Sequence, residues 1–143
     1  TKGYVDSNFQ LHESVTVIDG FFNLTYVRNK GAAWGFGRMF DDNIRIVLFK
    51  ILPVIAVGFL FYLLYKSVKE SLHITLSYAL IVAGAIGNLI DRIMLDFVVD
   101  FFDFYIGTSH FPAFNIADSS ITVAAVIIGY DALFIAPKKK KVK

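Results

Sequence analysis

The chain of 143 residues has room for one domain, and 56% of its residues are hydrophobic, above the roughly 45–50% of soluble domains. Only 18% are charged and the mean hydropathy is +0.60, so the composition indicates a membrane protein and argues against a soluble one. The absence of cysteine excludes disulfides, thiolate nucleophiles and cysteine-ligated metals, and the net charge of +2 gives no reason to expect nucleic acid as a partner.

The first 42 residues are the polar part of the chain and predict a small β region. Residues 14–18 and 21–27 alternate between the two sides of a strand and are rich in β-branched and aromatic side chains. Asp19-Gly20 between them is a pair typical of hairpin turns. The glycines that follow, from Gly31 onward, predict a tight loop with close backbone approach.

Three apolar segments follow, covering residues 46–65, 72–90 and 116–136. About 20 residues at 1.5 Å per residue match the ~30 Å hydrocarbon core of a bilayer. Small residues in the second segment, Gly84 and Gly87, permit close approach of a neighbouring membrane helix. We therefore expect a membrane α-helical fold with three transmembrane helices, in one membrane-embedded domain of residues 1–143.

The lysines near the ends of these segments predict how the chain crosses the membrane. Lys66 and Lys69 lie between the first two segments, and residues 138–143 form a basic tail after the third. Basic residues in short loops favour the cytoplasmic side, so both should lie in the cytoplasm. Residues 1–42 and 91–115 are then expected on the outer face.

Three acids, Asp91, Asp100 and Asp118, are gathered at that outer face. Charged groups beside hydrocarbon are costly, so residues kept there are candidates for function. Each also has a structural interpretation: Asp91 can pair with Arg92 at a helix end, and Asp118 can be the N-cap of the third span. Asp100 can instead belong to the solvated face of a surface helix, whose acids at helical spacing would be Asp96, Asp100 and Asp103.

Two carboxylates held close at a membrane boundary have a specific chemical use. Burial and like-charge repulsion raise the pKa of one of them, so that one acid is protonated while the other is ionised. The ionised acid takes a proton from water, and the protonated acid polarises the scissile carbonyl. Such aspartyl proteolysis needs neither cysteine nor a Ser/His pair.

Other interpretations remain open from the residues alone. A divalent cation is one, and its candidate ligands are Asp100, Asp103, His110 and Asp118. A non-catalytic membrane binding or assembly protein is another, with the acids acting as caps and ion pairs. A fragment of an ion-coupled transporter is the third, in which Asp131 would continue a path from the outer acids.

With these residues in view, the chain resembles the bacterial lipoprotein signal peptidases, the type II signal peptidases, over nearly its whole length. Four blocks carry the likeness, in the family's order: Asn29-Lys-Gly31-Ala-Ala, Gly87-Asn88-Leu-Ile-Asp91-Arg92, Val99-Asp100-Phe101, and Phe114-Asn115-Ile-Ala117-Asp118-Ser119. The resemblance implies an aspartic endopeptidase without metal or cofactor that cleaves diacylglyceryl-modified prolipoproteins before the lipidated cysteine. By the same likeness, Asp100 and Asp118 match the catalytic pair. The positions that match active-site support or substrate contact are Asn29, Gly31, Asn88, Asp91, Arg92 and Asn115.

The resemblance also carries expectations for the fold and its surroundings. An extracytoplasmic β-cradle would correspond to residues 1–42, and a short extracytoplasmic helix to residues 94–108. The family has four spans, and this chain opens at Thr1-Lys2 as though just after the first of them. We expect a monomer in the bacterial cytoplasmic (inner) membrane, with its active site near the outer face and lipid-modified prolipoproteins and membrane lipids as partners.

Overall fold

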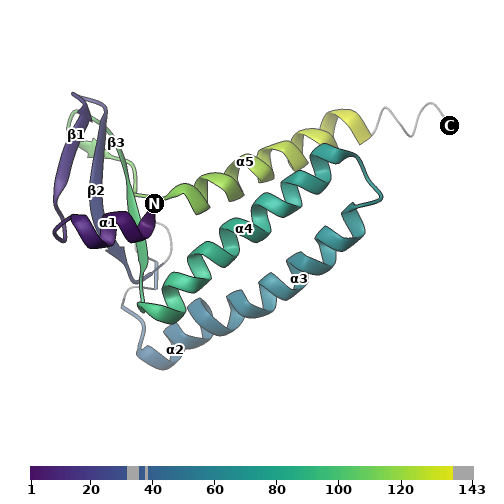
Figure 1. Cartoon of the computed structure of the whole chain (residues 1–143), viewed down its shortest axis with the longest axis horizontal. Coiled ribbons are helices and arrows are strands. Elements are labelled where there is room, and N and C mark those ends of the chain that lie inside the picture. Colours follow the sequence, from purple (N-terminus) through teal and green to yellow (C-terminus); the bar gives the residue numbers. More distant parts are fainter. Residues whose placement is uncertain (32–35, 38, 137–143) are drawn as a thin grey trace.

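The computed structural model describes residues 1–31, 36–37 and 39–136, and is drawn in Figure 1. Part of the first family block, Ala32-Ala33, and the basic tail 138–143 lie outside the described residues. The elements before the first long helix are α1 (Lys2–Asn8), β1 (Ser14–Ile18) and β2 (Phe22–Asn29). The remaining elements are α2 (Asp42–Ile46), η2 (Val47–Ile51), α3 (Leu52–Ser67), α4 (Leu72–Met94), β3 (Val98–Ile106), β4 (Ser109–His110), α5 (Ile116–Tyr130) and η3 (Asp131–Ile135).

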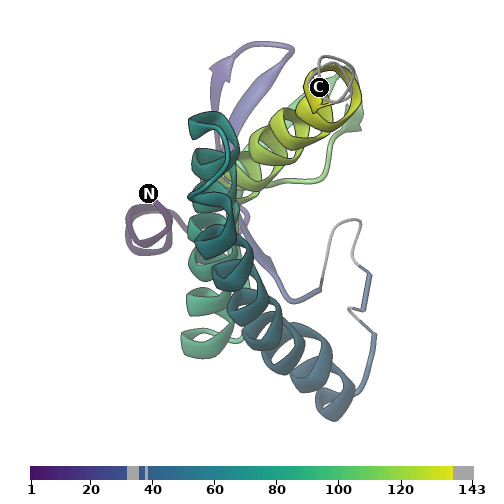
Figure 2. The same ribbon diagram turned by 90° about the vertical axis from the view of Figure 1, so that its right-hand side faces the viewer.

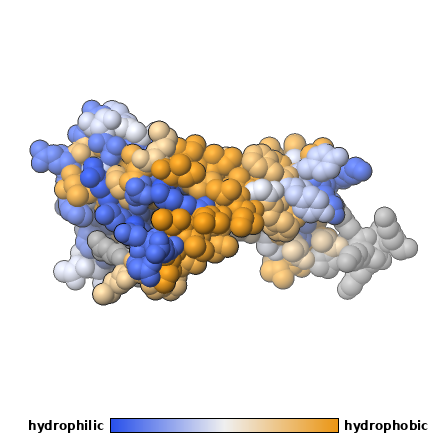
Figure 3. Space-filling model, turned by 90° about the horizontal axis from the view of Figure 1, so that it is seen from below, coloured by the Kyte–Doolittle hydropathy of each residue, from blue (hydrophilic) through white to orange (hydrophobic). Residues whose placement is uncertain are grey.

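Three helices among the described residues are long and apolar enough to cross a membrane: Asp42–Ser67, Leu72–Met94 and Ile116–Ile135. The first is continuous through α2, η2 and α3, and the third through α5 and η3. On the face drawn in Figure 3, an apolar band crosses the middle of the molecule, with hydrophilic surface toward both ends. The predicted membrane α-helical fold with three apolar helices is confirmed.

The central helix of the three is α4, which contacts both α3 and α5 (Figure 1). Seen from the end opposite the sheet, α3 and α5 extend from α4 in different directions (Figure 2). Gly84 lies where α4 meets α5, and a Cβ added there would come within 2.5 Å of the carbonyl oxygen of Ala117. Because no real Cβ tolerates that distance, glycine is needed at this crossing.

The strands form one antiparallel sheet in the order β1-β2-β3-β4, at one end of the helices (Figure 1). The short helix α1 lies against this sheet, and the core between them is formed by Val5, Tyr26, Val99 and Phe101. The predicted β strands within residues 1–42 are therefore present. A third long strand, β3, comes from the segment between α4 and α5.

The expected short helix over residues 94–108 is wrong, because most of this segment is strand β3. Its sequence, Val-Val-Asp-Phe-Phe-Asp-Phe-Tyr-Ile, consists largely of β-branched and aromatic residues, which favour strands. Asp96, with a φ of 64°, lies in the turn that separates α4 from β3. Asp100 and Asp103 are buried, so the alternative of a solvated helical face is also wrong. Among the described residues, the short helix that lies against the sheet is α1.

Candidate active site

Asp100 on β3 and Asp118 in the first turn of α5 are brought together through Asn115. The side-chain amide of Asn115 donates to Oδ1 of Asp100 at 2.7 Å. Its backbone N–H donates to Oδ2 of Asp118 at 3.1 Å. One asparagine thus holds an oxygen of each carboxylate, although the remainder of β3, β4 and a loop separate the two acids in the sequence.

The sheet positions Asn115 by holding the residue before it. Phe114 forms an isolated bridge with Phe102, and its carbonyl oxygen accepts from the N–H groups of Phe101 at 3.0 Å and Phe102 at 2.8 Å. Its ring stacks on Phe104 and meets Phe102 edge to face. The segment that enters α5 is therefore attached to the same strand that carries Asp100.

Asn115 is also the N-cap of α5, in a capping box with Asp118. Its side-chain oxygen accepts from the N–H groups of Ala117 at 2.8 Å and Asp118 at 3.1 Å. The alternative of Asp118 as the N-cap is therefore wrong, because Asp118 occupies the third helical position of the box. One oxygen of Asp118 belongs to this cap, while the other faces Asn88.

Two further asparagines complete the contacts of the acids. Asn88 on α4 donates from its amide to Oδ1 of Asp118 at 2.7 Å. Asn29, at the end of β2, donates to Oδ2 of Asp100 at 3.0 Å. Each of the four carboxylate oxygens thus accepts a hydrogen bond from an uncharged donor, so neither acid is neutralised by direct ion pairing within the described residues.

The surroundings of Asp100 favour its protonated form. Burial of the carboxyl group, which is 2% exposed as a residue, raises the pKa of Asp100 to about 6. The hydrogen bonds from Asn29 and Asn115 act in the opposite direction, while the charge of Asp118 adds to the increase. The buried member of the pair is therefore the one prepared to hold a proton.

Asp91 and Arg92 lie beside this pair but have different partners from those expected. Asp91 accepts from the N–H of Val99 at 3.0 Å and forms an ion pair with Lys2 at 2.8 Å, instead of pairing with Arg92. Arg92 donates from Nη2 to the carbonyl oxygen of Gly31 at 2.7 Å. Asp91 thus joins the end of α4 to β3 and α1, and Arg92 joins α4 to the loop after β2.

Lys2 is the site residue that sequence reasoning missed. Its ammonium group bonds the carboxylate of Asp91, and it donates to Oδ1 of Asn88 at 2.7 Å and to the carbonyl oxygen of Gly87 at 3.2 Å. Oδ1 of Asn88 accepts from Lys2 and also from the amide of Asn115 at 3.2 Å, so these two donors together orient the amide with its NH₂ group toward Asp118. The only sequence signal was its place in the Thr1-Lys2 stretch, which had suggested nothing about its contacts.

A family model described as Signal peptidase (SPase) II matches residues 1–134. The chain belongs to the signal peptidase II family. It is 47% identical over 133 residues to the lipoprotein signal peptidase of Syntrophus aciditrophicus, covering 93% of this chain and 83% of that protein. It is also 47% identical over 137 residues to the lipoprotein signal peptidase of Shewanella oneidensis, covering 94% of this chain and 78% of that protein.

Solved structures agree with this family assignment. A bacterial membrane enzyme determined by the in meso method at 2.3 Å resolution matches with a TM-score of 0.79 and 37% identity, over 99% of this chain and 83% of that one. A second such enzyme, at 1.9 Å resolution, matches with a TM-score of 0.75 and 35% identity, over 94% of this chain and 84% of that one. As a member of the signal peptidase II family, the chain is a peptidase and a multi-pass bacterial membrane protein.

The residues of the metal alternative do not form one cluster of ligands. Asp103 accepts from the amide of Asn23 at 3.1 Å, and its other oxygen lies 2.8 Å from Nδ1 of His110. The oxygens of Asp100 and Asp118 are directed to asparagines instead. Within the described part of the chain, no group of three or more histidine or acidic side chains has an arrangement suited to a metal ion.

Proposed function

We propose that this signal peptidase II family member is an aspartic endopeptidase of lipoprotein precursors. Its substrate is a diacylglyceryl-modified prolipoprotein, which it cleaves before the lipidated cysteine. Its relatives in Syntrophus and Shewanella are named for action on lipoproteins, which supports this substrate class. The observation that carries the proposed chemistry is the joining of Asp100 and Asp118 through Asn115, with Asp100 buried.

The two acids divide the steps of peptide hydrolysis between them. Asp118, ionised, takes a proton from a water molecule whose oxygen attacks the scissile carbonyl carbon. Asp100, protonated, gives its proton to the carbonyl oxygen, so that a neutral tetrahedral diol forms. Asp118 then passes its proton to the amide nitrogen, the C–N bond breaks, and Asp100 recovers a proton as the carboxyl product forms.

Three asparagines hold the two carboxylates in position for these roles. Asn115, Asn88 and Asn29 hold the carboxylates from three different elements, so that the pair needs no reorganisation when substrate arrives. Gly31 supports this region, since its carbonyl oxygen accepts from Arg92 and its N–H donates to Asn29, and the further N–H donors of Arg92 can orient the substrate backbone. In the proposed orientation the sheet end lies at the outer face of the inner membrane, and the signal helix of the substrate lies against the exposed apolar helices.

The other functional alternatives have less support. Asp131, the acid that would extend a transport path, is paired with Nε2 of His73 at 2.7 Å. This pair joins the start of α4 to the end of the third span, which accounts for Asp131 as a structural contact. A role in assembly alone does not require two acids sharing one asparagine.

The proposal is tested by incubating the purified protein in detergent with a purified diacylglyceryl-modified prolipoprotein. We expect one cut, with the lipidated cysteine identified by mass spectrometry as the new N-terminus. Addition of EDTA should leave the rate unchanged, because the proposed chemistry uses no metal ion. Absence of any cut by the folded protein, or loss of the activity in EDTA with recovery on adding a divalent cation, would contradict the proposed mechanism.

The pH dependence follows from the raised pKa of Asp100. Because the proposed acid acts when protonated, kcat/KM should fall as pH rises above about 6, approaching a tenfold loss per pH unit. The Asn29→Ala variant removes a hydrogen bond that lowers this pKa, so its profile should move to higher pH. The measurement is kcat/KM for prolipoprotein between pH 5 and pH 9. A rate that instead rises through pH 6 to a plateau would reverse the roles of the two acids.

A further inference from the structure

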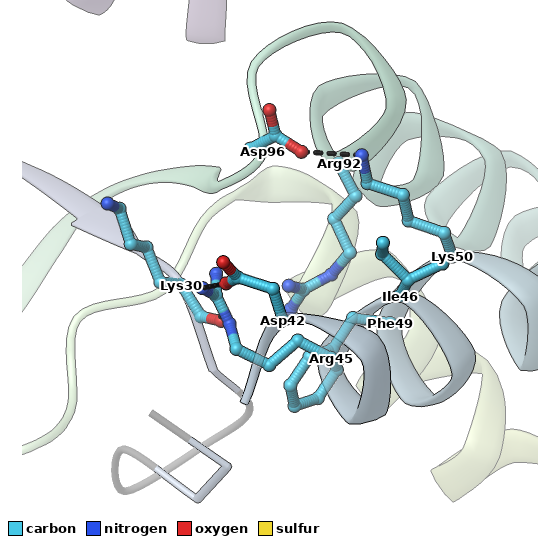
Figure 4. Close-up of a pocket in the computed structure, with 8 residues that line it drawn as sticks. All are labelled: Lys30, Asp42, Arg45, Ile46, Phe49, Lys50, Arg92 and Asp96. Atoms are coloured by element: carbon cyan, nitrogen blue, oxygen red, sulfur yellow. Dashed lines mark hydrogen bonds and ion pairs between the residues drawn. The ribbon is translucent and has the colours of Figure 1, made fainter. Parts of the chain in front are cut away.

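A cavity of about 370 Å³ lies between the start of the first long helix and the end of α4. Figure 4 shows the residues that line it. Its basic side chains are Arg45, Lys50 and Arg92, and its apolar side chains are Ile46 and Phe49. Asp42, Asp96 and Lys30 complete the lining, and the amine of Lys30 points away from the other labelled groups (Figure 4).

The two arginines of the cavity each have more N–H donors than the following contacts use. Arg45 donates to Asp42 at 3.1 Å and to the carbonyl oxygen of Lys30 at 3.4 Å, and Arg92 donates to the next carbonyl oxygen, that of Gly31. The guanidinium groups are therefore anchored on successive carbonyls. Nε of Arg45 is buried and has no hydrogen-bond partner among the described residues. A guanidinium group has five N–H donors in a fork that fits an oxyanion, so both arginines can bind a further acceptor.

The carboxylates in the lining do not cancel this positive charge. Asp42 has a side chain that is 91% exposed, and its contact with Arg45 is a surface ion pair. Asp96 is paired with Lys50 at 2.5 Å. Lys50 holds the pKa of Asp96 below its usual range, so this carboxylate is ionised. The lining still contains four basic residues against two acidic ones and is therefore net positive. The net positive charge and the unpartnered donor both indicate an anionic ligand.

The position of the cavity indicates that this anion carries an apolar tail. Ile46 and Phe49 in its lining belong to the helix Asp42–Ser67, whose next turns expose Ile51, Val54 and Ile55. Figure 3 shows the hydrophilic surface of the sheet end meeting the apolar band. A molecule in the cavity can thus keep a charged head among the arginines and lay its chains on the helix.

The π-helical segment η2 contributes to this arrangement. It carries Phe49 and Lys50 and ends at Ile51, two residues before Pro53, whose missing N–H cannot bond the carbonyl of Phe49. The wider turn changes the direction of both side chains relative to a regular α-helix. Irregular turns of this kind occur often at functional sites in helices.

We propose that this cavity binds the phosphodiester headgroup of a membrane phospholipid, whose acyl chains lie along the helix Asp42–Ser67. The diacylglyceryl group of the proposed substrate carries no charge and does not account for the basic lining. Arg45 and Lys50 contact neither Asp100 nor Asp118, so these two side chains lie outside the proposed catalytic pair, while Arg92 borders both the cavity and that pair. The inference depends on the membrane location and not on the proposed chemistry.

The test compares binding of phosphatidylglycerol and of diacylglycerol with the same acyl chains to the unmutated protein in neutral detergent, by native mass spectrometry. We expect retention of phosphatidylglycerol and little retention of diacylglycerol. The Arg45→Gln and Lys50→Gln variants should each weaken phosphatidylglycerol binding by about tenfold, because each loses a charge-assisted contact. Lys66→Gln, the same charge change at the far end of this helix, is the matched control and should bind as the unmutated protein does.

Three results would overturn the inference. Equal retention of diacylglycerol and phosphatidylglycerol would show that the apolar surface alone binds lipid. Unchanged binding by both folded cavity variants would place the phosphate elsewhere. Competition by inorganic phosphate at the same concentration as the lipid would identify a site for free phosphate instead. The comparison of the two lipids uses only the unmutated protein, so it holds even if a variant fails to fold.

Discussion

Replacing Asp118 with asparagine should lower kcat for prolipoprotein cleavage by at least about 10³-fold, because the general base that activates water is lost. The side-chain oxygen of the new asparagine can still accept from the N–H of Asn115, so the capping box can persist. The helix content by circular dichroism should therefore change little, whereas the melting temperature should fall modestly because the new NH₂ group faces that of Asn88. The rate is measured on purified diacylglyceryl-modified prolipoprotein at saturating substrate.

Asp100→Asn should cause a loss of similar size, since it removes the proton donor of the same pair. The double variant should be no worse than either single one, because groups that act as a unit are not additive. Asp103→Asn is the matched control: it changes another buried acid of β3, whose partners are Asn23 and His110. It should keep its rate within about threefold, as expected for a group outside the reacting pair. If either single variant retained a tenth of the normal rate, the proposed pair would not be the catalyst.

The acids were predictable from sequence because of where they lie along the chain. Asp118 opens an apolar span and Asp100 lies in the polar stretch between the second and third spans, so both had to lie at the same membrane face. Their joining through Asn115 was not predictable from spacing. It depends on Phe114, whose backbone pairs with β3 across a loop and so brings the start of α5 to Asp100.

The segment from Asp96 to Asp103 shows why the remainder of the fold was harder to predict. Its acids, Asp96, Asp100 and Asp103, have the spacing of a helix face, yet the residues between them favour a strand. Pairing with β2, a long-range contact, decides the outcome. Lys2 was missed for the same reason, since its partners Asn88 and Asp91 lie more than eighty residues away.

Lys2→Met should both destabilise the protein and slow it. Lys2 and Asp91 have side chains only 16% and 10% exposed, so removal of the lysine leaves a nearly buried carboxylate without its ion-pair partner. Breaking such a pair costs about 3–5 kcal/mol of unfolding free energy. Asn88 also loses the shorter of the two hydrogen bonds that fix its amide toward Asp118, and a misplacement of this kind should lower kcat by roughly 10- to 100-fold.

The Lys2→Met/Asp91→Asn double variant separates these two effects. It carries no unpaired buried charge, and asparagine can still accept from the N–H of Val99, so most of the lost stability should return. The rate should stay low, because the bond from Lys2 to Oδ1 of Asn88 is still missing and only the longer one from Asn115 remains. Stability is measured by denaturant unfolding in detergent and kcat by prolipoprotein cleavage. Recovery of kcat together with stability would show that Lys2 acts only through the fold, whereas recovery of stability alone would establish it as a positioning residue for Asn88 and Asp118.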